Sequence, residues 1–218
     1  DQIDTAWAEL GPAKSLIAES FVKFSREVSI IAVRGQDGDV KTWALAENHH
    51  HNGILSHSIV PAPNSTDLQP VAQDYITRLL NHLNYVGVLT LELFVTEQGL
   101  YANEMACRVH NSGHWSIEGA ICSQFENHIR AVAGLPLGAT DVVRPTVMIN
   151  IIGQHPKSED VLALKGAHLH LYNKSERAGR KLGHITLMPN NSDELTVLCR
   201  QLAQILPVPL ALTTDMNL

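Results

Sequence analysis

The feature that most constrains the fold is the stretch LTLELFVTEQGLYANEMA, which is typical of a β-hairpin. Two apolar runs, 88–95 and 100–106, flank a three-residue turn whose last residue, Gly99, can adopt the positive φ that such turns require. Counting back from this turn places Glu92 directly opposite Glu104, with both side chains on one face of the hairpin. Like charges at opposed positions repel each other, so some other interaction is expected to offset the repulsion between Glu92 and Glu104.

A divalent cation would offset the repulsion between these two carboxylates. Mg²⁺ is commonly held by one or two carboxylates together with substrate phosphates and water, and the adjacent Asn103 offers a further oxygen. The neighbouring side chains indicate a partly buried face, on which the repulsion would be stronger: Thr90, Phe94, Ala102 and Ala106. The alternative is that Glu92 and Glu104 face solvent, and a register slip of one residue would place them on opposite faces.

The remaining hydrophobic pattern predicts a protein of the α+β class. Further strands are expected at 15–22, 27–34, 40–46, 146–152, 168–172 and 184–187, and helices at 5–10, 66–83, 123–133 and 192–206. The polar segments 47–53 and 61–64 are predicted to be loops, the first of them rich in histidine. A boundary within 135–145 would divide the chain into two compact units, residues 1–140 and 146–218.

Three of the predicted helices carry a start signal, in which Ser, Thr or Asn is followed three residues later by Glu or Gln. These pairs are Thr66 with Gln69, Ser123 with Glu126, and Asn191 with Glu194. Within the helix 66–83, the helical period predicts a buried face made of Val71, Tyr75, Leu79 and Leu83.

Composition limits the possible partners. The 218 residues include 16 basic and 22 acidic side chains, and the net charge of −6 argues against nonspecific binding to nucleic acid or to an anionic membrane. No apolar run approaches the length of a membrane span. Three cysteines do not suggest a disulfide framework, so the cytoplasm is the expected compartment.

A polar segment, RVHNSGHW, follows the second strand of the hairpin at once and spans residues 108–115. The fork of Arg108 can donate two parallel hydrogen bonds to a planar oxyanion, and His110 can donate, accept or transfer a proton near neutral pH. A small anion such as bicarbonate, or a phosphate-bearing substrate, suits this chemistry. The alternative is a loop whose polar groups cap nearby backbone, but its position beside the two glutamates favours a functional site.

These features together resemble a known family. The stretch LELFVTEQGLYANEMACRVHNSGHWSIEGAICSQFENHIRAVAGLPLG is similar to the ATP-grasp core of the N5-carboxyaminoimidazole ribonucleotide synthases, and HNSGHW separates that family from other ATP-grasp proteins. Shorter stretches agree, namely SREVSI, ENHHHNGIL and KSERAGRKLGH. The resemblance implies the C-terminal half of an ATP-grasp domain followed by a small mixed α/β C-terminal domain, with the N-terminal nucleotide-fold domain absent.

The resemblance also implies a function and its cofactors. Members of this family are ligases that carboxylate 5-aminoimidazole ribonucleotide in de novo purine biosynthesis, using ATP, Mg²⁺ and bicarbonate, and they are commonly homodimers. By this resemblance Asp1 falls inside the ATP-grasp domain, so we expect the chain by itself to be inactive or nearly so. Two alternatives are another ATP-grasp ligase, such as formate-dependent glycinamide ribonucleotide transformylase, and a noncatalytic dimerisation or binding fragment.

Residue by residue, the resemblance assigns the contacts to nucleotide and metal. Glu92 and Glu104 match the Mg²⁺ ligands, and Asn103 and Glu104 border the ATP phosphates. Glu27 matches an acid that contacts the ribose, and His50 matches a histidine that contacts the nucleotide. The hinge whose backbone meets the adenine corresponds to Glu19, Ser20, Phe21 and Val22.

The resemblance assigns the contacts with substrate to residues of two polar segments. Arg108 and His110 match an active-site pair near bicarbonate and the imidazole, with Asn111 and Ser112 beside the substrate. A basic turn is assigned to the substrate phosphate and to closing of the site, with its first lysine in the catalytic set: Lys174, Arg177, Arg180 and Lys181. Paired basic side chains recognise phosphate well, although without the family a solvated basic turn would be the simpler interpretation.

The other histidines have simpler interpretations. His49 and His51 flank His50 in the predicted loop and are expected to face solvent, since the three side chains do not converge on one point. His168 and His170 share one face of a predicted strand and are expected to be structural or adjacent to substrate. Zinc is not expected there, because no further ligands accompany them.

Overall fold

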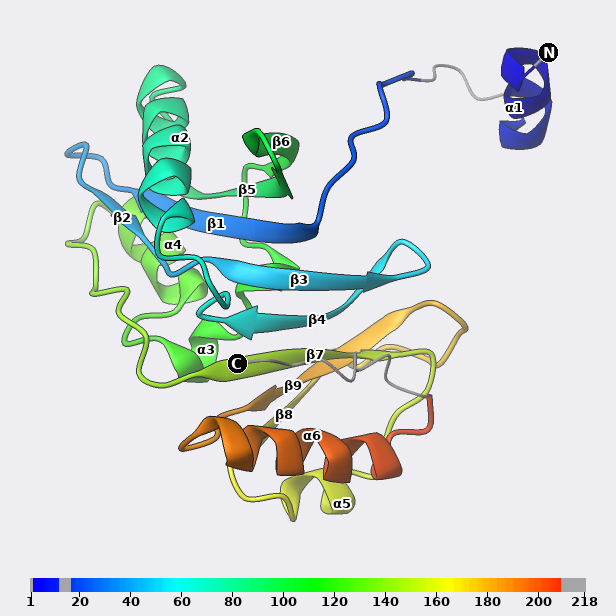
Figure 1. Cartoon of the computed structure of the whole chain (residues 1–218). Helices are drawn as coiled ribbons and strands as arrows, with labels where there is room; N and C mark the ends of the chain where they lie inside the picture. The colour runs from blue at the N-terminus through cyan, green and yellow to red at the C-terminus, as the bar shows by residue number, and fades with distance from the viewer. Residues whose placement is uncertain (1, 12–16, 209–218) are drawn as a thin grey trace.

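A computed structural model of the chain describes residues 2–11 and 17–208, and its centre is a long antiparallel β-sheet (Figure 1). The strands are β1 (Arg26–Arg34), β2 (Val40–Thr42), β3 (Ala46–His51), β4 (Ile54–Val60), β5 (Gly87–Thr96), β6 (Gly99–Ala106), β7 (Thr146–Ile152), β8 (Ala167–Leu171) and β9 (Lys181–Leu187). Within the described residues they are ordered β6-β5-β1-β3-β4-β7-β9-β8, and β2 pairs with β1. The predicted α+β class is confirmed.

Helices cover the sheet on both faces (Figure 1). Helix α2 (Leu68–His82) packs on β1 and β5, and α5 (Ser158–Leu162) and α6 (Ser192–Ile205) pack on the C-terminal strands. The opposite face of β1 meets the 3₁₀ helix η1 (Asn111–Gly113) and α4 (Gln124–Val132), and α3 (Ser116–Gly119) lies between these two in the chain. Helix α1 (Gln2–Leu10) contributes no buried residue. Among the described helices, none combines the length and apolarity that a membrane crossing requires.

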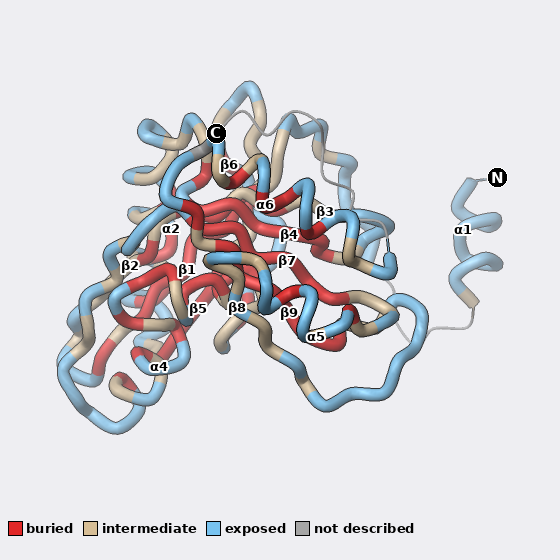
Figure 2. Tube along the Cα trace, turned by 90° about the horizontal axis from the view of Figure 1, so that it is seen from below, coloured by how far each residue is buried: buried red, intermediate tan, exposed pale blue. Residues whose placement is uncertain are grey.

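Strand β1 lies between two parts of the core. Its residue Ile30 packs with Ile76 and Leu80 of α2, whereas Ile31 packs with Trp115 on the other side. Alternate residues of a strand point to opposite faces, which explains why this strand, buried on both, is a nearly continuous apolar run in the sequence. Figure 2 shows the buried residues running along the central strands, with the outer helical turns and loops exposed.

The predicted hairpin is β5–β6, and Glu92 and Glu104 are opposed as predicted. The turn is shorter than predicted, because Thr96 pairs with Gly99 across only two residues. Gly99 does adopt a positive φ, of 119°. The register shifts by one residue between Glu92 and its neighbour, which leaves Asn103 as an extra residue in β6. This bulge compensates for the shorter turn, so two differences of one residue cancel and the glutamates still meet.

Two of the three predicted helix starts are confirmed. The side chain of Ser123 accepts a hydrogen bond from the Glu126 backbone N–H, and Asn191 does the same for Glu194. The start predicted at Thr66 is wrong, because α2 begins at Leu68.

The predicted buried face of this helix holds only at Leu79, which packs partly buried against the core. Helix α2 fully buries Ala72, Ile76 and Leu80 instead, and it exposes Val71, Tyr75 and Leu83. Both series are apolar at a spacing of four, so the periodicity alone did not choose between them.

The histidine-rich segment is a strand and not the predicted loop. As β3, it pairs with β1 on one side and with β4 on the other. His49 is not solvent-facing as predicted, because its ring stacks on that of His57 with centroids 4.4 Å apart, and its Nε2 lies 3.2 Å from Glu47 Oε1. Glu47 also accepts a hydrogen bond of 2.8 Å from Arg26. Protein groups therefore surround side chains that the sequence pattern assigned to water.

Other strand predictions hold only in part. The strand predicted at 15–22 falls partly outside the described residues, and 17–22 have no regular structure, so that part is wrong. The run 40–46 is divided between β2 and the start of β3. Helices α3 and α5 and the 3₁₀ helix were not predicted, because each has five residues or fewer.

The predicted boundary at 135–145 lies between α4 and β7. Strand β4 nevertheless pairs with β7, so hydrogen bonds of one sheet continue from the N-terminal into the C-terminal part. The division into units 1–140 and 146–218 stays a prediction.

His57 predicts a specific pH dependence of stability. Its ring is fully buried, and burial lowers its pKa from 6.5 to about 3. The unfolded chain therefore takes up this proton at higher pH than the folded chain, so stability is lost as the pH falls from 6.5 towards 3. The substitution His57→Phe keeps the stacked ring and removes the proton, so the free energy of unfolding should fall less steeply over this range.

Urea unfolding at a series of pH values measures this slope. The exposed His51 supplies the matched control, His51→Phe, for which the slope should equal that of the parent chain. An equally steep slope in His57→Phe would contradict the prediction.

Candidate functional site

The two opposed glutamates lie on the sheet face that is covered by the polar segment 108–115. This segment contains η1 and is called the polar loop from here on. Glu92 is the partner of both Ser29 on β1 and Glu104 on β6. The loop is fixed to this face because Ser29 donates a hydrogen bond of 2.9 Å to the hydroxyl of Ser112. Strand alternation places Glu27 on the same face as Ser29. Residues predicted separately from the hairpin and from the polar segment are thus brought together.

Glu92 is a carboxylate in an acidic setting. Its side chain is 13% exposed, and burial raises its pKa. The carboxylates of Glu104 and Glu27 raise it further, while His50 and Lys181 act in the opposite direction. Two carboxylates that disfavour each other's charge fit a divalent cation, which would bind between them with phosphate oxygens and water as its other ligands. Within the described residues, no group of three or more His, Cys, Asp or Glu side chains is arranged to hold a metal.

A second polar pair borders these glutamates. His50 Nδ1 lies 3.1 Å from Glu27 Oε2, and both side chains are partly exposed. Burial raises the pKa of Glu27 and lowers that of His50, so each departs from its usual range in the direction of the neutral form. The pair can therefore donate and accept hydrogen bonds towards a polar ligand lying on this face.

His110 presents an N–H group to Glu92. Its Nδ1 accepts a hydrogen bond of 3.4 Å from the Ser112 backbone N–H and lies 2.9 Å from the Ser112 hydroxyl. An accepting Nδ1 places the ring proton of the neutral imidazole on Nε2, which lies 3.8 Å from Glu92 Oε1. Burial, with the nearby charges of Arg108 and Lys181, lowers the pKa of His110 to about 4. The ring is therefore neutral near physiological pH.

Ser112, predicted to contact substrate, is fully buried with its hydroxyl between Ser29 and His110. In this position it orients the imidazole of His110.

Gln124 holds the polar loop in place and was not predicted. Its side chain is fully buried; Oε1 accepts from the His110 backbone N–H at 2.9 Å, and Nε2 donates to the His110 carbonyl at 2.7 Å. Nε2 also lies 3.2 Å from His114 Nδ1. In the sequence Gln124 merely follows the N-cap Ser123, and nothing there distinguishes it from a solvent-facing residue of a first helical turn.

An amide pair joins the loop to β7 and brings in a lysine. Asn111 and Asn150 exchange two hydrogen bonds, of 2.9 and 2.7 Å, and Lys181 Nζ donates to Asn111 Oδ1 at 2.8 Å. Burial lowers the pKa of Lys181, and the charge of Glu92 acts against this shift. Asn150 was not predicted, although a polar residue inside the apolar run 146–152 was an available signal.

The remaining predicted basic residues lie outside this group. Lys174 and Arg177 are exposed in the turn between β8 and β9, and Arg180 donates to the Ser175 hydroxyl at 3.0 Å. Arg108 is exposed and donates to the Val109 carbonyl.

The predicted hinge residues Glu19, Ser20, Phe21 and Val22 precede β1 without regular structure, and Phe21 is 93% exposed. Phe21 and Val22 line an open groove of about 630 Å³ together with Tyr101 and the β5–β6 turn.

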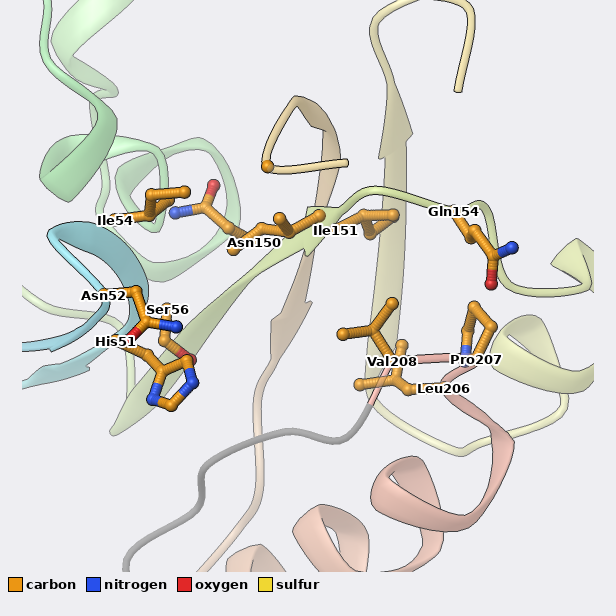
Figure 3. Close-up of a pocket in the computed structure, with 12 residues that line it drawn as sticks. His51, Asn52, Ile54, Ser56, Asn150, Ile151, Gln154, Leu206, Pro207 and Val208 are labelled. Atoms are coloured by element: carbon orange, nitrogen blue, oxygen red, sulfur yellow. The ribbon is translucent and has the colours of Figure 1, made fainter. Parts of the chain in front are cut away.

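A separate pocket is lined in part by Asn150 (Figure 3). It has a volume of about 280 Å³ and is lined by the β3–β4 turn, β7 and the segment Leu206–Val208. It includes none of the predicted site residues.

Two family models match the chain. The ATP-grasp domain matches residues 1–125, and the phosphoribosylaminoimidazole carboxylase C-terminal domain matches residues 146–197. The glutamate hairpin and the polar segment 108–115 fall within the first match. The basic turn from Lys174 to Lys181 falls within the second.

Curated and solved relatives agree with the family models. The chain is 48% identical over 211 residues to N5-carboxyaminoimidazole ribonucleotide synthase of Vibrio parahaemolyticus, which covers 94% of the chain and 55% of that protein. The crystal structure of the Thermus thermophilus synthetase shares 50% identity and a TM-score of 0.85, covering 87% of this chain and 53% of that one.

A structure of the synthase from Aspergillus clavatus in complex with ADP and 5-aminoimidazole ribonucleotide shares 30% identity and a TM-score of 0.79, covering 85% and 52% of the two chains. The chain thus spans about half the length of the curated relatives it matches.

Proposed function

Because the chain belongs to the ATP-grasp family and, within it, to the N5-carboxyaminoimidazole ribonucleotide synthases, we propose that it forms the catalytic sheet of an enzyme that carboxylates 5-aminoimidazole ribonucleotide. The family predicted from the motifs is the family found. The observation that carries the proposal is the meeting of Glu92, Glu104 and His110 on one sheet face. ATP and bicarbonate are the proposed co-substrates.

The proposed reaction has two steps. In the first, an oxygen of bicarbonate attacks the γ-phosphorus of ATP, the bond to ADP breaks, and carboxyphosphate forms. In the second, the amine of 5-aminoimidazole ribonucleotide attacks the carboxyl carbon and loses a proton. The bond from that carbon to phosphate breaks, giving N5-carboxyaminoimidazole ribonucleotide and phosphate.

The side chains of this sheet suit the first step. Mg²⁺ held by Glu92 and Glu104 would neutralise charge on the ATP phosphates. Asn103, the bulged residue of β6, lies beside Glu104 and can contact the same phosphates. Glu27 and His50 form the polar pair proposed for the ribose side of the nucleotide. Phe21 and its neighbours are proposed to meet the adenine.

The polar loop suits the second step. His110 is neutral, and its Nε2–H can donate to an oxygen of bicarbonate or carboxyphosphate. Arg108 can add its fork to the same oxyanion. Lys181 and Asn111 lie at the junction of the loop with β9, and we propose that they and the basic turn with Lys174, Arg177 and Arg180 recognise the substrate, the turn binding its phosphate.

Activity is best measured in a chimaera in which the N-terminal region of the Vibrio parahaemolyticus enzyme precedes this chain. Phosphate release from ATP should require both 5-aminoimidazole ribonucleotide and bicarbonate. Release with formate and glycinamide ribonucleotide in their place would instead identify a different ATP-grasp ligase. A folded chimaera that releases no phosphate under any combination would refute the enzymatic proposal and favour a binding fragment.

Two further properties remain proposals. A homodimer and a cytoplasmic location are expected from the family and from the three free cysteines, Cys107, Cys122 and Cys199. Sedimentation of the chimaera measures the first of these directly.

A further inference from the structure

Three histidines, one of them in the polar segment 108–115, and a tyrosine form a set of contacts that extends towards the basic turn, and the proposed reaction gives none of them a role. His114 follows η1, His170 belongs to β8, Tyr172 follows β8, and His184 belongs to β9. We call these four residues the ring cluster. It joins two segments that the proposed function requires to act on one substrate.

The ring cluster is anchored on the sheet and on α3. His170 and His184 are cross-strand partners, and their rings stack with centroids 4.4 Å apart and planes 10° apart. His170 Nε2 lies 2.6 Å from Glu118 Oε1 on α3, which directly follows the polar loop. His184 is 2% exposed, and its Nδ1 lies 2.8 Å from the hydroxyl of Tyr172. The phenol is therefore held at its hydroxyl end by a buried, stacked imidazole.

Tyr172 in turn holds a basic residue. The Nζ of Lys174 lies 5.4 Å from the centroid of the Tyr172 ring, within the range of a cation–π contact. Lys174 is exposed and its side chain has four rotatable bonds, so a fixed aromatic face reduces the positions open to its ammonium group.

The ring cluster also reaches the loop that carries His110. The His114 ring lies 5.1 Å from that of His184 and 6.2 Å, edge to face, from that of Tyr172. His114 Nδ1 meets Gln124, which binds the backbone N–H and carbonyl of His110. A continuous set of contacts therefore connects the backbone of His110 to the ammonium of Lys174.

We propose that Tyr172 and His184 are positioning residues, which hold Lys174 at a fixed place relative to the His110 loop and thereby set the affinity for the phosphate of the substrate. The inference rests on the proposed function, since it assumes that Lys174 meets that phosphate. A purely structural cluster makes a different prediction, because its disruption would lower stability and affect both substrates alike.

Steady-state kinetics of the chimaera test the proposal. Tyr172→Leu removes the aromatic face, so the KM for 5-aminoimidazole ribonucleotide should rise about tenfold while the KM for ATP stays within about twofold. Tyr172→Phe keeps the ring and loses only the hydroxyl contact with His184, so a rise of about threefold is expected. The matched control is Tyr75→Leu, the same change at an exposed tyrosine of α2, which should change neither constant. Equal rises in both KM values, or none, would overturn the proposal.

A double-mutant cycle asks whether Tyr172 acts through Lys174. In the background Lys174→Ala, adding Tyr172→Leu should raise the KM no further, because the group that the ring positions is already absent. A full, independent effect of the second substitution would show that Tyr172 acts by another route.

The contact between Lys174 and the Tyr172 ring can be measured in the 218-residue chain itself, because the measurement does not require enzymatic activity. The side-chain methylene protons of Lys174 should show upfield NMR shifts from the Tyr172 ring, retained in Tyr172→Phe and lost in Tyr172→Leu. Absence of these shifts in the parent chain would overturn the inference even where a variant fails to fold. Absence of substrate-dependent phosphate release in the parent chimaera would instead remove the proposed function, and the inference with it.

Discussion

Replacing Glu92 with glutamine is expected to reduce phosphate release by the chimaera about 100- to 1,000-fold, the usual cost of removing one preorganised group that stabilises charge in a transition state. Glutamine has nearly the same shape as glutamate, so the change removes the charge and keeps the packing. Glu92 is opposed to Glu104 across the hairpin, and the proposed Mg²⁺ needs a carboxylate from each strand. The loss should therefore appear in kcat at saturating ATP and Mg²⁺.

The same substitution should raise the stability of the metal-free chain. Burial and the carboxylates of Glu104 and Glu27 raise the pKa of Glu92, so its charged form is disfavoured in the folded state. An amide at this position relieves that repulsion, and the free energy of unfolding should increase by roughly 0.5 kcal/mol, as for opposed like charges on paired strands. A substitution that lowers activity but raises stability indicates that the original residue is retained for function.

The control for both measurements is Glu159→Gln, which removes a carboxylate from an exposed position on α5. Phosphate release and urea unfolding should both match the parent within error. A Glu92→Gln chimaera that keeps most of its activity would show that the metal, if bound, is held by other groups.

Replacing Gln124 with alanine is expected to have the largest effect on stability, a loss of about 2–4 kcal/mol in the free energy of unfolding. The change leaves the backbone N–H and carbonyl of His110 without the partners they have in the folded chain. It also opens a cavity at a fully buried position. Activity should fall as well, because the loop that carries His110 would no longer be held against α4.

Urea unfolding of the 218-residue chain measures this loss. The control is Gln36→Ala, because Gln36 is exposed and its side chain also donates to a backbone carbonyl, that of Val132. Its cost should stay below about 1 kcal/mol, since water can replace the lost bond. Gln124→Glu keeps the acceptor for the His110 N–H and loses the donor for the carbonyl, so it should also destabilise. Equal costs for Gln124→Ala and Gln36→Ala would contradict the argument.

The glutamate hairpin was predictable because its information is local. Strand alternation and the glycine at the turn are properties of neighbouring residues, and they place Glu92 opposite Glu104. The two-residue turn and the bulge at Asn103 were not predictable from the pattern, since the two changes cancel in the register. Caps at Ser123 and Asn191 were predicted for the same reason, as each depends on a residue three positions away.

The histidine-rich strand shows why polar segments mislead. Polar composition favours a loop when water is assumed to be the partner of each side chain. In β3 the partners are protein groups brought from elsewhere: His57 for His49, and Glu27 for His50. Choosing between these outcomes requires knowing which strands lie on either side of β3.

By itself, the sequence determined the family, the hairpin with its two carboxylates, and the residues of the polar loop, because each of these depends on residues that are adjacent in the chain. Only the tertiary structure decided which distant groups support that loop. Ser29, Gln124 and Asn150 reach it from β1, α4 and β7, and each satisfies a polar group that burial would otherwise leave unpaired. Hydrogen bonds of this kind depend on distances between elements far apart in the chain, which local spacing does not encode.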